Sequence, residues 1–454
     1  MLVSFLPIHP IEFRYNTKEM RDLFTEEAKL QNWLEVEAAL AKAHAEVGNI
    51  PISAAEEIGK KANLNYVTLE RVKQIEKEIH HDIMAMVRAL DEQCDGDAGN
   101  YIHYGATSYD IVDTALALQL KKALNVIENR ILNLLRVLLK LCEEHKETVC
   151  VGRTHGQHAI PTTYGMKFAV WAAEVGRHLS RLNEVKYRCL KGKMSGAVGT
   201  MASFGKKGFE IQDLVMKYLG LTPVLIANQV VQRDIHAEVI VLLNYIVSTA
   251  DKIAREIRNL QRTEIGEIFE PFAAKQVGSS TMSHKRNPHK SERIVSLARR
   301  IKTNIIVAFD NIPLEHERDL TNSANERIII PESFILTDYI LSQLISILEG
   351  LEFNYENIKR NLELTKGQIL SEKIMIELVK KGISRQEAHE ILRQSGIKSR
   401  KEGKSLKEVI IENPAVNKFV IVKELDEWLN PKNYIGTAIE QVEKVINQLK
   451  RYIE

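Results

Sequence analysis

The chain has 454 residues, of which 44% are hydrophobic, and its 62 Lys and Arg residues nearly balance its 60 Asp and Glu residues. That balance gives no support to nucleic-acid binding, which requires a strong basic excess. Glycine (23) and proline (11) are scarce, and long stretches rich in Ala, Leu, Glu and Lys predict a mostly helical protein.

The four cysteines, Cys94, Cys142, Cys150 and Cys189, form no C-x-x-C pair. Neither a zinc knuckle nor a disulfide framework is therefore indicated, and we expect reduced thiols in a cytoplasmic protein. The first residues lack a basic segment and their apolar run ends at Pro7, which argues against a signal peptide. No stretch approaches the roughly 18 apolar residues of a membrane span.

The N-terminal part, residues 1–108, is expected to form a small helical domain. It starts with an irregular arm over residues 1–20 that contains two prolines. Apolar spacing and stop signals then predict three helices, from about Trp33 to Val47, from Pro51 to about Asn63, and from Thr68 through Val87.

Five long helices are expected in the middle of the chain, residues 109–351. The clearest runs from Tyr109 to about His145, with no Pro or Gly in about 37 residues, or roughly 55 Å. The other four are expected from Thr162 to about Leu190, from about Val230 to Arg262, from about Lys290 to Phe309, and from about Pro331 to Leu351. Helices of this length indicate a bundle.

Beyond residue 351 the pattern changes to short helical segments separated by Gly and Pro, which predicts a C-terminal helical domain over 352–454. Short strands are indicated only at Thr148–Val151 and Val224–Ile226. The fold class is therefore all-α, with a central bundle of five long helices flanked by two smaller helical domains.

A polar loop, GSSTMSHKRNPHKSE from Gly278 to Glu292, separates two of the long helices. Asn287–Pro288 stops a helix there, because the residue before proline is pushed out of the α region. By composition the loop suits equally an enzyme loop that closes over an anionic substrate and a solvated basic turn.

Other polar clusters fall at breaks between helices, where free backbone N–H groups bind anions. In GRTHGQH, His155 has small neighbours and is a candidate for proton transfer, although a loop histidine on its own is more often structural. The spacing of His80, His81 and His103 does not match a zinc site, and no P-loop or dinucleotide fingerprint occurs. We therefore expect neither metal nor cofactor.

The order GSSxMxxKxNP resembles the signature loop of the fumarase/aspartase superfamily, whose members eliminate fumarate from a substituted succinate. Ser283 stands where the family usually has proline, which bears on the stiffness of the loop. The resemblance implies that Ser279 is the base that removes a proton, and that Lys285 and Asn287 stabilise the resulting charge.

The segment GRTHGQHAIPTT resembles the second motif of the adenylosuccinate lyases. It implies that His155, and not His158, is the general acid that protonates the departing nitrogen. Glu292 matches the glutamate that orients this histidine, and Arg293 beside it resembles a substrate-binding arginine.

Further motifs imply the substrate-binding set. The pair at 81–82 resembles the family's His-Asp pair, with His80 in place of a common arginine, and HYGATSYDIVDTA resembles HxGxTSxDxxDT. The segment ERDLTNSANER resembles a nucleotide-phosphate loop, since arginine forks and serine hydroxyls suit phosphate. The resemblance also places His81, the histidine that contacts the substrate, among the catalytic residues. The substrate-binding residues so implied are Arg14, Tyr15, His80, Asp82, His103, Thr107, Ser108, Gln229, Asn287, Arg293, Arg318, Ser323 and Arg327.

The resemblance implies an adenylosuccinate lyase of purine nucleotide biosynthesis, acting on adenylosuccinate and on its ribotide analogue SAICAR. It also implies a homotetramer whose sites draw His81, His155 and Ser279 from three subunits. Two alternatives stay open. Another fumarate-releasing lyase, such as argininosuccinate lyase, is disfavoured by the phosphate loop, and a non-catalytic scaffold of the same fold is disfavoured by the presence of every catalytic position.

Overall fold

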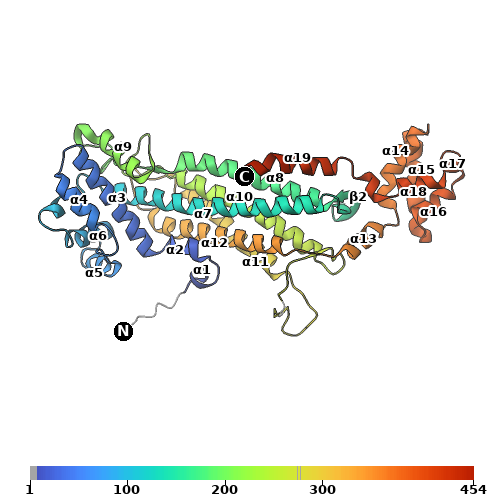
Figure 1. Cartoon of the computed structure of the whole chain (residues 1–454), viewed down its shortest axis with the longest axis horizontal. Helices are drawn as coiled ribbons and strands as arrows, with labels where there is room; N and C mark the ends of the chain where they lie inside the picture. The colour runs from blue at the N-terminus through green and yellow to red at the C-terminus, as the bar shows by residue number, and fades with distance from the viewer. Residues whose placement is uncertain (1–7, 274, 277) are drawn as a thin grey trace. The chain divides into compact units, whose positions relative to one another are not determined.

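The described residues, 8–273, 275–276 and 278–454, are mostly helical in this computed structural model, with 66% of residues in helices and 5% in strands (Figure 1). The all-α class is therefore confirmed. By their internal contacts the residues form two compact units. Unit 1 consists of residues up to Ile131, His178–Ala250 and Ser296–Ser342, and unit 2 of Leu132–Arg177, Asp251–Val295 and Gln343–Glu454.

The N-terminal arm is more regular than predicted. Residues 1–7 lie outside the described residues, but two short helices form within the rest of the arm, α1 (Pro10–Phe13) and α2 (Lys18–Asp22). Each begins at a side-chain cap, because His9 and Thr17 accept backbone N–H groups of the first turn.

The N-terminal helices bury one apolar core with residues of α9, centred on side chains such as Leu34, Ile58 and Ile83. The predicted helix from Thr68 through Val87 is wrong, since the chain forms two helices there. His80 adopts a left-handed conformation (φ 53°, ψ 37°) that ends the first, and the side chain of His81 caps the second. The elements are α3 (Glu26–Glu46), α4 (Ile52–Lys61), α5 (Leu69–Ile79), α6 (Asp82–Asp91) and η1 (Ala98–Tyr101).

The five long helices of the bundle are present, each with residues in both units, and polar pairs join them. In unit 1, Lys186 of α8 reaches Glu128 of α7 at 2.6 Å and Asn304 of α11 reaches Glu332 of α12 at 3.0 Å. The bounds are α7 (Ser108–His145), α8 (Tyr164–Cys189), α10 (Asp234–Leu260), α11 (His289–Asp310) and α12 (Ser323–Glu349).

Helix α12 begins eight residues earlier than predicted, because Pro331 lies inside the helix and not at its start. Ser323 and Arg327 consequently occupy its first two turns and not a loop. An 18-residue window of α12 is apolar enough by composition to cross a membrane, but 72% of it is buried within the protein, as in the central helix of a bundle.

The strands are few and form three two-stranded sheets. The predicted strand at Thr148–Val151 exists and continues into a hairpin of β1 (Val149–Thr154) and β2 (Gln157–Thr163). The strand predicted at Val224–Ile226 is wrong, because the pairing with β3 covers Thr222 and Pro223 and ends before Val224. The other strands are β3 (Lys191–Gly192), β4 (Thr222–Pro223), β5 (Ile268–Phe269) and β6 (Glu352–Phe353).

The C-terminal part contains short helices around a core of its own, which includes Ile374, Leu378 and Leu425. The division into three domains at about residues 108 and 351 stays a prediction. The remaining helices are η2 (Gly205–Lys207), α9 (Gly208–Leu219), α13 (Tyr355–Glu363), η3 (Gln368–Leu370), α14 (Ser371–Lys380), α15 (Arg385–Glu402), α16 (Leu406–Ile411), α17 (Pro414–Asn417), α18 (Val422–Trp428), η4 (Pro431–Tyr434), α19 (Ala438–Leu449) and η5 (Lys450–Tyr452).

Candidate active site

The predicted site residues fall in both units. Unit 2 holds four of the predicted catalytic residues, His155, Ser279, Lys285 and Glu292, together with Asn287 and Arg293. Unit 1 holds the other predicted catalytic residue, His81, and the remaining substrate-binding residues. Each unit is therefore described in turn.

In unit 1, the break between α5 and α6 brings the histidine–aspartate pair to other predicted residues. Nδ1 of His81 accepts the N–H of Met84 at 3.3 Å, so the neutral ring carries its proton on Nε2. That nitrogen lies 3.5 Å from Oγ of Ser108. Asp82 accepts a hydrogen bond from Arg327 of α12 at 3.1 Å, so the motifs at 81–82, 108 and 327 meet.

His103 is held by a carboxylate that sequence reasoning missed. Its Nδ1 lies 2.6 Å from Glu37 Oε1, and its backbone N–H donates to Glu37 Oε2 at 3.1 Å. Burial alone would lower the pKa of His103, but the charge and hydrogen bond of Glu37 outweigh it, and the pKa is raised. The Glu37 carboxylate therefore stabilises the cationic form of this ring relative to a free imidazole.

The phosphate motif gathers around Tyr109, in the first turn of α7. The guanidinium of Arg318 stacks on the Tyr109 ring, 4.0 Å from its centre, and the Tyr109 hydroxyl donates to Ser323 Oγ at 3.2 Å. Arg318 also donates to Gln229 Oε1 at 2.8 Å. Arg318 and Ser323 of the phosphate motif thus lie together with Gln229, another predicted substrate-binding residue, in unit 1.

Two buried aspartates of α7 support this region. Asp110 pairs with the fully buried Lys193 and accepts the N–H groups of Ser195 and Gly196. Asp113 forms a two-pronged pair with Arg233, with both N–O distances 3.0 Å. Burial alone would raise the pKa of Asp113, but the charge of Arg233 outweighs it, and the pKa is lowered.

Arg14 and Tyr15 lie elsewhere in unit 1. The Tyr15 ring packs edge-on against Tyr339, with centroids 5.8 Å apart. Tyr339 follows Ser323 on α12 by 16 residues, which is about 24 Å of helix. A single unit 1 therefore does not bring these two residues to the Ser323 cluster.

In unit 2, His155 sits at the tip of the β1–β2 hairpin. His155 (φ 52°) and Gly156 (φ 73°) both adopt the left-handed region, which a two-residue hairpin turn requires, and the imidazole is exposed. Two residues earlier, Arg153 pairs with the buried Glu267, which also accepts hydrogen bonds from Tyr164 (2.5 Å) and Asn361 (2.8 Å). The strand that leads into the turn is thus tied to the buried Glu267.

The loop Gly278–Glu292 folds back on itself. Gly278 approaches the carbonyl of Lys285 so closely that an added Cβ would lie 1.9 Å from the oxygen, and Asn287 donates to the Gly278 carbonyl at 2.8 Å. Between them, Oγ of Ser279 accepts the N–H groups of Met282 (3.0 Å) and Thr281 (3.3 Å). Two donors directed at one hydroxyl oxygen favour its deprotonated form.

Two anchors hold the end of this loop. Arg286 pairs with Glu352 at 2.8 Å and lies over Phe272 at 5.0 Å. The buried Glu270 accepts the N–H of Ser291 at 3.0 Å and so caps the start of α11, where a carboxylate is favoured.

Two predicted site residues, Glu292 and Arg293, lie in the first turn of α11. Glu292 lies 3.7 Å from Arg258, and Arg293 is half-buried on the same turn. The expected contact between Glu292 and His155 stays a prediction.

Comparisons with known proteins bear on these motifs. A family profile described as Lyase matches residues 12–302, and one described as Adenylosuccinate lyase C-terminus matches residues 367–445. The adenylosuccinate lyase of Pyrococcus abyssi is 56% identical over 445 residues, 98% of each chain. That of Methanocaldococcus jannaschii is 56% identical over 446 residues, 98% of this chain and 96% of the other.

The chain belongs to the adenylosuccinate lyase family. The wider likeness extends to solved structures of the superfamily. The crystal structure of 3-carboxy-cis,cis-muconate lactonizing enzyme from Pseudomonas putida has a TM-score of 0.89 at 32% identity, covering 97% of this chain and 98% of that one. The helical fold of this chain is therefore similar to that of an enzyme whose name gives a different reaction.

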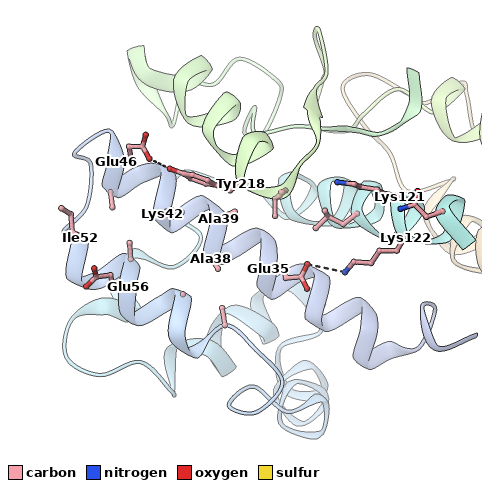
Figure 2. A pocket seen from close by; sticks show the side chains of 17 residues that line it. Glu35, Ala38, Ala39, Lys42, Glu46, Ile52, Glu56, Lys121, Lys122 and Tyr218 are labelled. Carbon is pink, nitrogen blue, oxygen red and sulfur yellow. Dashed lines mark hydrogen bonds and ion pairs between the residues drawn. The ribbon is translucent and has the colours of Figure 1, made fainter. Parts of the chain in front are cut away.

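A large pocket of about 990 Å³ lies away from the family motifs, in the N-terminal part of unit 1 (Figure 2). Its lining is rich in alanine from α3 and α4, and several of its charged groups already have partners. Tyr218 donates to Glu46, and Lys122 lies 3.5 Å from Glu35. Among the described residues that line it there is no predicted site residue.

The residues that sequence reasoning missed include three acidic partners, Glu37, Glu267 and Glu270. A weak signal existed for the last two, because GEIFEP places carboxylates beside apolar residues of a buried strand. Among the described residues no cluster of three or more His, Cys, Asp or Glu side chains is arranged to hold a metal ion.

Proposed function

We propose that this chain is a C–N lyase that releases fumarate from adenylosuccinate, giving AMP, and from SAICAR, giving AICAR, in purine nucleotide biosynthesis. The observation that carries the proposal is the 53–56% identity, over 98–99% of the chain, to four relatives named adenylosuccinate lyase. The cluster around Tyr109 supports it, since an arginine fork and a serine hydroxyl suit a nucleotide phosphate.

Elimination begins when a base removes the weakly acidic proton next to a carboxylate of the succinyl group. We assign this step to Ser279, whose Oγ accepts two backbone N–H groups. Such donors stabilise the alkoxide that the reaction needs. The charge then moves into the neighbouring carboxylate as a dianion, for which Lys285 and Asn287 supply positive charge and a donor.

Bond cleavage requires a proton on the departing purine nitrogen. We assign it to His155, whose exposed ring at the tip of a rigid hairpin is accessible to a substrate. Histidine exchanges protons near neutral pH, so it suits general acid catalysis. In our proposal Glu292 orients its ring, and His81 and Ser108 bind the succinyl end.

The test uses purified protein with adenylosuccinate, argininosuccinate, malate and aspartate in turn, and records fumarate by its ultraviolet absorbance. We expect fumarate from adenylosuccinate alone among these four. Release from argininosuccinate would instead favour the related lyase, and no release from any of them would favour a non-catalytic scaffold.

We further propose a homotetramer in the cytoplasm with sites shared between subunits. Arg14 and Tyr15 lie about 24 Å along α12 from Ser323, so a nucleotide that contacts both sets would take them from two chains. Exposed apolar residues on α11, such as Ile306 and Phe309, also need cover. The cysteines are free, and three of them are buried, which fits a reducing compartment. Cell fractionation would check this location.

Sharing is tested by mixing two inactive variants, His155→Ala and Ser279→Ala. If each site takes these residues from different chains, equal amounts refolded together restore about a quarter of wild-type activity, since each residue is intact with a chance of one half. Hybrid oligomers that mass spectrometry detects but that stay inactive would contradict shared sites.

A further inference from the structure

Tyr109 contacts two residues of the phosphate motif, Arg318 and Ser323. It was not among the site residues predicted from the sequence. The side chain is 7% exposed at the start of α7. Its ring supports the Arg318 guanidinium at 4.0 Å, and its hydroxyl donates to Ser323 at 3.2 Å. A cavity of about 150 Å³ lies beside it and is lined also by Ser323 and Arg327.

The hydroxyl of Tyr109 fixes the direction of the Ser323 hydrogen. A serine hydroxyl can both accept and donate. Because Ser323 Oγ accepts from Tyr109, its own hydrogen is left to donate to another acceptor. A negatively charged acceptor such as a phosphate oxygen would form the strongest hydrogen bond with this hydrogen, since hydrogen bonds to charged groups are the strong ones.

The ring of Tyr109 supports the Arg318 guanidinium. The guanidinium carbon lies over the ring, 4.0 Å from its centre, and Nη1 is bound to Gln229 at 2.8 Å. The buried Nε has no hydrogen-bond partner among the described residues. A buried donor of this kind calls for an acceptor, and an arginine held in place by two neighbours is suited to bind phosphate.

We infer that Tyr109 is a positioning residue that holds Arg318 and Ser323 as a pair of donors for the 5′-phosphate and so sets the preference for a nucleotide over a nucleoside. The inference rests on the proposed function, because it assigns a phosphate to this cluster. It adds a residue that acts through two others and does not itself take part in the elimination.

The test compares AMP with adenosine as probes, with calorimetry on wild type and two variants. Tyr109→Phe keeps the ring and loses one hydrogen bond, so AMP should bind about threefold to tenfold more weakly. Tyr109→Leu also loses the stacking and should weaken AMP by roughly a further tenfold. Adenosine affinity should stay within about twofold in both, and KM should rise in Tyr109→Phe with little change in kcat.

The matched control is Tyr245 on α10, whose ring also supports an arginine, Arg181, at 5.0 Å. Tyr245→Phe and Tyr245→Leu should leave the AMP-to-adenosine ratio unchanged. If Tyr109 had a merely structural role, its variants would bind AMP and adenosine more weakly by the same factor, and this result would overturn the inference. Tyr109 variants that keep the wild-type ratio of AMP to adenosine affinity would also overturn it. So would a wild type with no preference for AMP over adenosine. Failure of the wild type to release fumarate would contradict the proposed function alone, since these binding ratios need no turnover.

Discussion

Replacing Gly278 by alanine places a methyl group where the loop has no room for one. The added Cβ would lie 1.9 Å from the Lys285 carbonyl oxygen, whereas real Cβ atoms essentially never come within 3.0 Å of such an atom. The two limbs of the loop must therefore separate by at least 1.1 Å. The backbone of Gly278 is outside the left-handed region, so the effect is steric.

That separation acts directly on Ser279, the next residue. A misplacement of about 1 Å costs on the order of 100-fold in rate, or about 2.7 kcal/mol in the activation free energy. We expect Gly278→Ala to lower kcat for adenylosuccinate about 100-fold in a fumarate absorbance assay. The melting temperature should change little, because most of the loop is exposed.

Gly59→Ala is the control, because an added Cβ there meets nothing within 4 Å. It lies inside α4, where alanine is favoured over glycine by up to about 1 kcal/mol, so this variant should be fully active and slightly more stable. A Gly278→Ala enzyme within about threefold of wild-type kcat would refute the proposed coupling between loop packing and catalysis.

Three further changes test single residues. Ser279→Ala should lower kcat by about 10² to 10⁴-fold while the Kd for AMP, by calorimetry, stays within about tenfold; near-normal turnover would contradict the base assignment. Arg318→Ala should weaken AMP by about 2 to 5 kcal/mol and leave adenosine nearly unaffected; equal losses would argue against a phosphate contact. Glu37→Gln should destabilise the protein by about 1.5 to 3 kcal/mol at about pH 5.5, between the ordinary pKa values of glutamate (about 4.3) and histidine (about 6.5), as measured by urea unfolding. Because the pKa of His103 is raised, this stabilisation is complete below its ordinary pKa of about 6.5 and is lost as the pH rises through the raised pKa, so a difference that grows with pH would contradict the pairing.

The long helices were predictable because their signals are local. The prediction for α7 differed from the structure by one residue at its start, since Thr107 and Ser108 give a clear helix-start signal and no proline or glycine interrupts the pattern. The break at His80 had no such signal, because the four-residue apolar spacing continues across it from Ile79 to Ile83.

The site was predictable as far as its motifs are contiguous. The clusters at 278–292 and 315–327 were found from their order of residues. Their supports were not, because ion pairs join distant segments: Glu37 precedes His103 by 66 residues, and Arg153 precedes Glu267 by 114. Nothing local in a sequence marks such partners.

Pro331 has a consequence for how α12 opens. Proline has no N–H, so the carbonyl of Arg327 lacks its usual partner four residues on. The two turns that carry Ser323 and Arg327 are therefore joined to the rest of the helix by one bond fewer than a regular helix provides. We expect these two turns to unfold locally more readily than the rest of the helix, so that their amides exchange with solvent faster than those after Pro331. A ligand held by those two turns should slow that exchange by a factor that rises with the ligand concentration divided by its Kd, so binding should be measurable by hydrogen exchange at residues 323–330 without any catalysis.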